Sequence, residues 1–128
     1  MTKFVVDASA WIDYFDESER GKRLAKILES DDSELFTSAA TVAEVVSKFL
    51  RRKFPPENAV NAIISLSNVL DVTSDIAWET GKIHSEVKKR NESFGMLDAF
   101  VMATARSMST KVLTSDNDFR IFKEAVFV

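Results

Sequence analysis

Cysteine is absent from the 128 residues of this chain, and glycine and proline are scarce, with three and two residues. The lack of cysteine excludes disulfides and thiolate metal sites, and it permits a reducing compartment. No apolar run is long enough to span a membrane, and the apolar run near the N-terminus is too short for a signal peptide. We therefore expect a cytoplasmic protein with no membrane association.

Positive charge is not in excess either, since the formal net charge is −3. This balance excludes a polycationic protein that coats nucleic acid, although a local basic groove remains compatible with it. Hydrophobic residues make up 45% and charged residues 29% of the chain, which is ordinary for a globular protein. The length is enough for a hydrophobic core, and we expect a single domain over residues 1–128.

Short apolar segments alternate with longer amphipathic ones along the chain. We predict strands at residues 3–7, 34–38, 69–73 and 111–115, an edge strand at 125–128, and helices at 8–15, 18–30, 39–53, 57–68, 74–91 and 95–108. This alternation indicates an α/β fold with a mainly parallel sheet of four or five strands. In such folds, ligands bind at the carboxyl ends of the strands.

Two helices carry more detailed expectations. Ser38 precedes the helix at 39–53 and is predicted to cap it. The helix at 74–91 is expected to bury a face that contains Ile76, Trp78, Ile83 and Val87.

Four acidic residues are predicted at one rim of this sheet. Asp7 follows the first strand, Glu44 lies early in the helix after the second, Asp98 lies in the first turn of its helix, and Asp116 follows the fourth strand. Taken singly, each has a structural explanation. The aspartates suit turns, caps or a helix dipole, and Glu44 suits a surface ion pair with Lys48.

Taken together, these carboxylates would repel one another, because no lysine or arginine lies within two residues of any of them. Hard divalent cations relieve such repulsion, and oxygen ligands suit Mg²⁺ or Mn²⁺. A cation held in this way can activate water and neutralise charge on a phosphodiester. The pattern therefore predicts metal-dependent phosphoryl hydrolysis.

Three segments resemble the PIN domain family, which includes the VapC toxins of toxin–antitoxin pairs. They are FVVDASAWI at 4–12, TSAATVAEVVS at 37–47 and GMLDAFVMATARSMSTKVLTSDNDF at 95–119. The resemblance implies a PIN-like, Rossmann-like three-layer α/β/α sandwich and an endoribonuclease that needs Mg²⁺ or Mn²⁺. In the toxin branch it also implies a small antitoxin protein that blocks the site. Asp7, Glu44, Asp98 and Asp116 match the acidic quartet of the family.

The same resemblance assigns three further residues. Asp118 matches a position that is acidic in only some members, and Ser9 and Ser115 match small hydroxyl residues that orient the site in relatives. Separately, Arg51, Arg52 and Lys53 end a predicted helix, where they suit either a solvated helix end or contacts with an RNA backbone.

Partners are predicted as an RNA substrate, an antitoxin and a second copy of the chain. The homodimer is expected because Trp11, Phe15 and Phe54 exceed the apolar surface that one small domain readily buries. The only histidine, His84, lies mid-helix away from the acids and is not expected to act as a base.

Alternative functions remain open at this point. A PIN domain can serve in RNA processing without an antitoxin. A receiver domain of a signalling pair would need a phosphoacceptor after the third strand, where Asp71 or Asp75 is available, and a lysine after the fifth strand, which is missing. A haloacid-type phosphatase would need a second aspartate where this chain has Ser9. A binding protein could also keep the acids without turnover.

Overall fold

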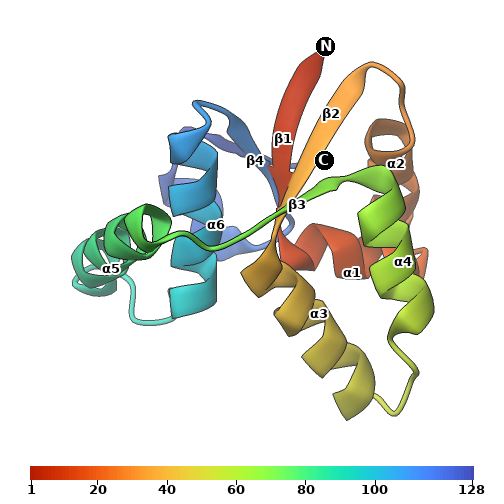
Figure 1. Ribbon diagram of the computed structural model, residues 1–128, viewed down its shortest axis with the longest axis horizontal. Coiled ribbons are helices and arrows are strands. Elements are labelled where there is room, and N and C mark those ends of the chain that lie inside the picture. The colour runs from red at the N-terminus through yellow and green to blue at the C-terminus, as the bar shows by residue number, and fades with distance from the viewer.

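A parallel β-sheet forms the centre of the computed structural model, which describes residues 1–128 (Figure 1). Its strands are β1 (Thr2–Val6), β2 (Ser33–Ser38), β3 (Asn68–Leu70), β4 (Lys111–Leu113) and β5 (Ala125–Val126). Neighbouring strands pair in the order β3-β2-β1-β4-β5, and every pair is parallel. The predicted parallel sheet is confirmed, with β5 at one edge.

Helices cover both faces of this sheet. They are α1 (Ala8–Asp16), α2 (Glu19–Leu28), α3 (Ala39–Arg51), α4 (Glu57–Leu66), α5 (Ser74–Lys88) and α6 (Met96–Ser107), and a 3₁₀ helix, η1, spans Asn117–Ile121. Helices α1 to α4 lie on one side of the sheet, and α5 and α6 lie on the other (Figure 1). This arrangement confirms the three-layer α/β/α sandwich. None of the helices combines the length and the apolar character that a membrane span requires.

Alternate residues of each strand supply the two cores. Phe4 and Val6 of β1 pack with the helices α1 to α4, whereas Val5 between them packs with α5 and α6. Because successive side chains of a strand point to opposite faces, both faces of the central strand are apolar. This explains why the central strand is a continuous apolar run in the sequence rather than an alternating one.

The direction in which the chain winds fixes where a ligand can bind. From β1 the chain moves outward through β2 to β3, and it then crosses to β4 and β5 on the other side of β1. The carboxyl ends of β1 and β4 therefore border the switch point, where open α/β sheets bind ligands. Val6 pairs with Leu113 in this register, so the next residues, Asp7 and Thr114, lie side by side at the rim.

The face assigned to the helix at 74–91 was wrong at one residue. Trp78 is 72% exposed, and Thr80 is buried in its place with its hydroxyl donating to the carbonyl of Ile76. The buried Thr80, Ile83 and Val87 and the partly buried Ile76 follow one narrow stripe with helical spacing, against which α6 packs. Trp78 lies two residues from this stripe and points away from it.

The structure also bears on three smaller expectations, of which one is confirmed. The third strand was predicted at 69–73 but ends at Leu70, because its partner β2 ends at Ser38 and offers no further residue to pair with. The cap by Ser38 is confirmed, since its hydroxyl accepts a hydrogen bond from the amide of Ala40 at 3.1 Å. Trp11 is fully buried and Phe15 stacks against it, so only Phe54 of the proposed dimer residues is largely exposed.

Candidate active site

Asp7 is anchored at the centre of the rim by two hydroxyl groups. Ser9 Oγ donates to Asp7 Oδ2 at 2.6 Å, and Thr114 Oγ1 donates to the same oxygen at 3.0 Å. Each hydroxyl also accepts from an amide, Ser9 from Ser115 at 2.9 Å and Thr114 from Asp116 at 3.0 Å. These bonds join the end of β1 to the segment after β4, and they leave Asp7 Oδ1 without a protein donor.

Asp116 follows this segment and caps the helix η1. Its Oδ1 accepts from the amide of Asp118 at 2.9 Å, as the capping prediction required. Asp118 is fixed from the other side, because its Oδ1 accepts from Ser93 Oγ at 2.7 Å and from Asn91 Nδ2 at 3.3 Å. The loop between α5 and α6 therefore sets the position of the Asp118 carboxylate.

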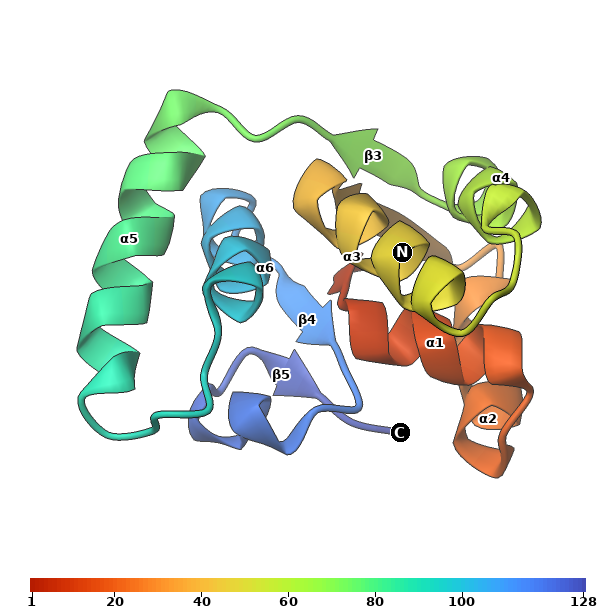
Figure 2. The same cartoon turned by 90° about the horizontal axis from the view of Figure 1, so that it is seen from below.

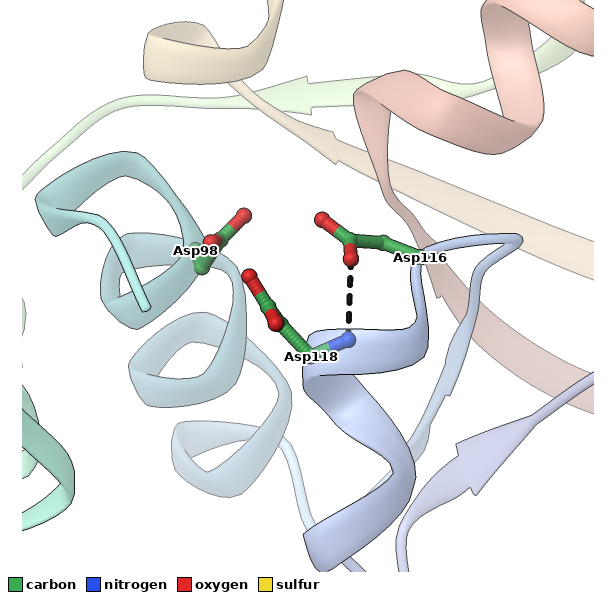
Figure 3. Close-up of side chains that lie close together, drawn as sticks. All are labelled: Asp98, Asp116 and Asp118. Carbon is green, nitrogen blue, oxygen red and sulfur yellow. Dashed lines mark hydrogen bonds between the residues drawn. The ribbon is translucent and has the colours of Figure 1, made fainter. Parts of the chain in front are cut away.

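Asp98 combines a cap with a place in the site. Its Oδ2 accepts a hydrogen bond from the amide of Gly95 at 3.1 Å and so closes the first turn of α6. Oxygens of Asp98, Asp116 and Asp118 lie within 4.8 Å of one another, and the three side chains converge from α6 and η1 (Figure 3). Asp98 therefore closes the first turn of α6 and also lies among the acids of the rim.

Glu44 completes the cleft from α3. Asp7, Glu44, Asp98 and Asp116 all line one cleft with a volume of about 390 Å³. The ion pair expected between Glu44 and Lys48 does not form, and no lysine or arginine nitrogen lies within 4.0 Å of any of the four carboxylates. Each of the four therefore keeps at least one oxygen without a protein partner.

Burial and mutual repulsion alter the acidity of this cluster. Burial raises the pKa of Glu44 to about 7, helped by the charges of Asp7 and Asp116 and opposed by Lys48 and Arg51. Burial also raises the pKa of Asp98 to about 7. The hydrogen bond from the Gly95 amide opposes this rise, and the charges of the nearby acids add to it. The pKa of Asp7 is raised by its complete burial, which the bonds from Ser9 and Thr114 oppose.

The family model of the PIN domain matches residues 4–125, nearly the whole chain. The chain belongs to the PIN domain family. No curated protein matches it by sequence.

Solved structures share the fold of this PIN domain. One is a toxin–antitoxin complex from Klebsiella pneumoniae, with 22% identity, a TM-score of 0.75, and coverage of 96% of this chain and 95% of the other. VapC20 of Mycobacterium tuberculosis, described as a toxin that cleaves the sarcin-ricin loop, gives 22% identity, a TM-score of 0.76, and coverage of 98% and 96%. VapBC2 of Rickettsia felis, bound to promoter DNA, gives 12% identity, a TM-score of 0.75, and coverage of 98% and 96%.

Family membership also decides against the signalling alternative. Asp71 and Asp75, the two receiver candidates, are both exposed, and neither lines the cleft of the PIN domain. His84 lies on α5 and is likewise absent from the cleft lining, in agreement with the expectation from the sequence.

Thr114 is the site residue that sequence reasoning missed. The hydroxyl role was assigned to Ser9 and Ser115, but the side-chain oxygen of Ser115 is buried without any hydrogen-bond partner. Its backbone amide, rather than its hydroxyl, contacts Ser9. Pairing residues 4–6 with 111–113 places Thr114 beside Asp7. The register of these two strands would therefore have predicted the contact.

The three residues predicted to contact RNA lie in different surroundings in the structure of the PIN domain. Arg51 lines the acidic cleft. Arg52 instead pairs with Asp16 at 2.9 Å and lines a second cavity of about 760 Å³ between α1, α2 and α4. Lys53 follows α3, is exposed and lines neither cavity.

We expect the metal-free PIN domain to lose stability as the pH rises from 5 to 8. The folded state holds protons on Glu44 and Asp98 up to about pH 7, whereas the unfolded chain releases them near pH 4, so the folded state binds more protons in this window. The free energy of unfolding should fall by about 2 kcal/mol across the window, since one pKa unit corresponds to about 1.4 kcal/mol and solvent screening reduces the sum.

Thermal melts in EDTA at each pH measure this loss. Combined Glu44→Gln and Asp98→Asn substitutions should flatten the dependence, because they remove the titrating groups. A parent protein whose melting temperature rises from pH 5 to 8 would contradict the raised pKa values.

Proposed function

We propose that this PIN domain is an endoribonuclease that cleaves RNA phosphodiester bonds with Mg²⁺ or Mn²⁺, and that it is the toxin of a toxin–antitoxin pair. The observation that carries the proposal is the convergence of four unneutralised carboxylates, Asp7, Glu44, Asp98 and Asp116, in one cleft. An arrangement that raises the pKa of three of its four members, Asp7, Glu44 and Asp98, destabilises the metal-free site and favours a bound cation.

The donor set fits a hard divalent cation. The acidic residues of the cleft offer carboxylate oxygens, which Mg²⁺ and Mn²⁺ prefer over nitrogen or sulfur. Asp98, Asp116 and Asp118 offer oxygens close enough together to share one ion, and Asp7 and Glu44 border the same cleft. When bound, the cation supplies Lewis-acid chemistry, because it offsets negative charge on a phosphoryl group and lowers the pKa of water.

The protein's own residues contribute orientation and proton transfer. The hydroxyls of Ser9 and Thr114 fix Asp7 so that one of its oxygens faces no protein donor. Glu44 lines the cleft beside the other acids and has no hydrogen bond to either of its oxygens, so its carboxylate is free to accept a proton from an attacking water. We therefore propose Glu44 as the general base of the cleavage step.

The toxin assignment rests on the structural neighbours. One of them is described as a toxin–antitoxin complex, another as a member of a family of toxin–antitoxin systems, and VapC20 as a toxin that cleaves the sarcin-ricin loop. A short protein partner that covers the cleft is the matching proposal for this chain. A second copy of the chain stays a proposal, supported by the exposed Phe54 and Trp78.

Purified protein should cut single-stranded RNA internally when Mg²⁺ or Mn²⁺ is present, and EDTA should stop the reaction. Glu44→Gln should lower the rate by about 100-fold or more, within the usual range for a general base. His84→Ala should cut at the parent rate, because His84 lies outside the cleft. Gel analysis of a labelled RNA measures all three.

The same assay has outcomes that contradict the proposal. Cleavage that continues in EDTA, or that is lost equally in His84→Ala, would exclude a carboxylate-held cation as the catalyst. The toxin branch is tested in cells, where expression of the parent alone should stop growth and Glu44→Gln should not. Cleavage in vitro without growth arrest would favour an RNA-processing role.

A further inference from the structure

Three cationic side chains share the acidic cleft, although none of them forms an ion pair with Asp7, Glu44, Asp98 or Asp116. Arg20 of α2 and Lys48 and Arg51 of α3 line the cleft together with the four carboxylates. Lys48 and Arg51 lie close enough to lower the pKa of Glu44, yet neither comes within 4.0 Å of a carboxylate oxygen. The charge of these two side chains is therefore available to an anionic ligand.

Arg20 is held in place beside the acids by its own contacts. Its Nη1 lies 3.9 Å from Asp13 Oδ2 and donates to the carbonyl of Ser115 at 3.4 Å. Ser115 directly precedes Asp116, so this bond ties the start of α2 to the acidic rim. The Arg20 side chain is 46% exposed, and its guanidinium keeps donors that can contact a ligand.

The cations flank the acids from two directions. Helix α1 starts at the rim and lies between α2 and α3 (Figure 2), so the cleft-lining Arg20 of α2 and the cleft-lining Lys48 and Arg51 of α3 belong to helices on opposite sides of α1. A phosphodiester at the carboxylates would have cationic side chains on both sides of it. A single nucleic-acid strand presents this pattern, because phosphates follow one another along its backbone.

We propose that Arg20, Lys48 and Arg51 bind the phosphates on either side of the cleaved bond, so that the RNA strand crosses the cleft from α2 to α3. This inference rests on the proposed ribonuclease function and names the residues that position its substrate. It also gives Arg51 a role different from that of its neighbour Arg52, whose charge is paired with Asp16.

The alternative is that these cations only offset repulsion among the acids. In that case their loss would lower the stability of the metal-free protein but leave RNA binding with the same dependence on salt. Contacts with phosphates predict the reverse. Each contact on a single strand releases counterions and adds about 0.7 to the slope of log affinity against log salt.

Fluorescence anisotropy of a labelled single-stranded RNA separates these possibilities. Binding is measured with Mg²⁺ from 50 to 200 mM salt, in an Asp98→Asn background, and gels verify that the RNA stays intact. The slope of log affinity against log salt should fall by about 0.7 in each of Arg20→Gln, Lys48→Gln and Arg51→Gln. Between 50 and 200 mM salt, the factor by which affinity drops should therefore be about 2.5 times smaller in each variant than in its parent. At 50 mM salt each should bind several-fold more weakly than its parent.

Arg23→Gln and Lys26→Gln are the matched controls, since both residues are exposed on α2, neither lines the cleft, and each change removes the same charge. They should keep the parent slope. Equal slopes for all five variants and their parent, or equal reductions in all five, would overturn the proposal. Cleavage by the protein without Asp98→Asn is measured in parallel. If the slopes are as predicted but this protein does not cleave RNA, the proposed ribonuclease function is wrong and the proposed phosphate contacts stand.

Discussion

Asp98→Asn is expected to reduce RNA cleavage by about 100-fold or more while making the metal-free protein more stable at pH 8. The carboxylate of Asp98 shares the cleft with Asp7, Glu44 and Asp116, and one of its oxygens lies within 4.8 Å of an oxygen of Asp116 and of Asp118. Two unit charges about 5 Å apart repel by roughly 3 kcal/mol at an effective dielectric of 20. After solvent screening, removal of one charge should stabilise the empty site by about 1 kcal/mol.

The amide of asparagine preserves the structural part of the side chain's role. Asp98 accepts from the amide of Gly95, and the carbonyl oxygen of Asn can accept the same bond. Asp98→Ala loses both the charge and this cap, which is worth about 1 kcal/mol. The alanine variant should therefore melt below the asparagine variant, and the difference between them measures the cap.

The pH gives a second test of the same variant. Because the pKa of Asp98 is about 7, its carboxyl is protonated in the folded protein at pH 5, and the gain from Asp98→Asn should vanish there. Added Mg²⁺ should stabilise the parent more than the variant at pH 8, since a ligand of the native state raises stability by mass action. A variant that melts lower in EDTA at pH 8 and gains as much from Mg²⁺ as the parent would make Asp98 a cap without a role in metal binding.

The convergence of the acids could be predicted because it depends on local features of the sequence. Asp7 and Asp116 each follow a short apolar run, and in a parallel sheet the carboxyl ends of strands meet at one edge. The caps of Asp116 and Ser38 are local as well, since each contact spans two residues. These features need no knowledge of how distant segments pair.

The features that were missed depend on contacts between distant segments. Thr114 reaches Asp7 across 107 positions of sequence through the pairing of β1 with β4. Trp78 was assigned to the core because it is large and apolar, but the stripe that faces α6 is narrow and passes through Thr80 instead. Hydrophobicity identified the helix correctly and did not determine which residues of it are covered by α6.

Gly21 shows a further contact of this kind, where α2 approaches α1. A Cβ at this position would lie 1.9 Å from the backbone oxygen of Asp13 and 2.7 Å from its carbonyl carbon. These are backbone atoms of another helix and cannot rotate away as a side chain can. Gly21 also donates its amide to the N-cap residue Ser18 at 3.0 Å, so the start of α2 is held at this close approach.

Gly21→Ala is therefore expected to destabilise the protein by about 2–3 kcal/mol, because the overpacked helices must separate. Gly81→Ala is the matched control, since Gly81 lies within α5 and nothing is within 4 Å of the added Cβ. Alanine is the better helix former, so the control should gain up to about 1 kcal/mol. Thermal melts of the two variants should thus move in opposite directions from the parent. Equal gains in both would show that α2 can move away from α1 at little cost, and Arg20, which precedes Gly21, would then not be rigidly placed beside the cleft.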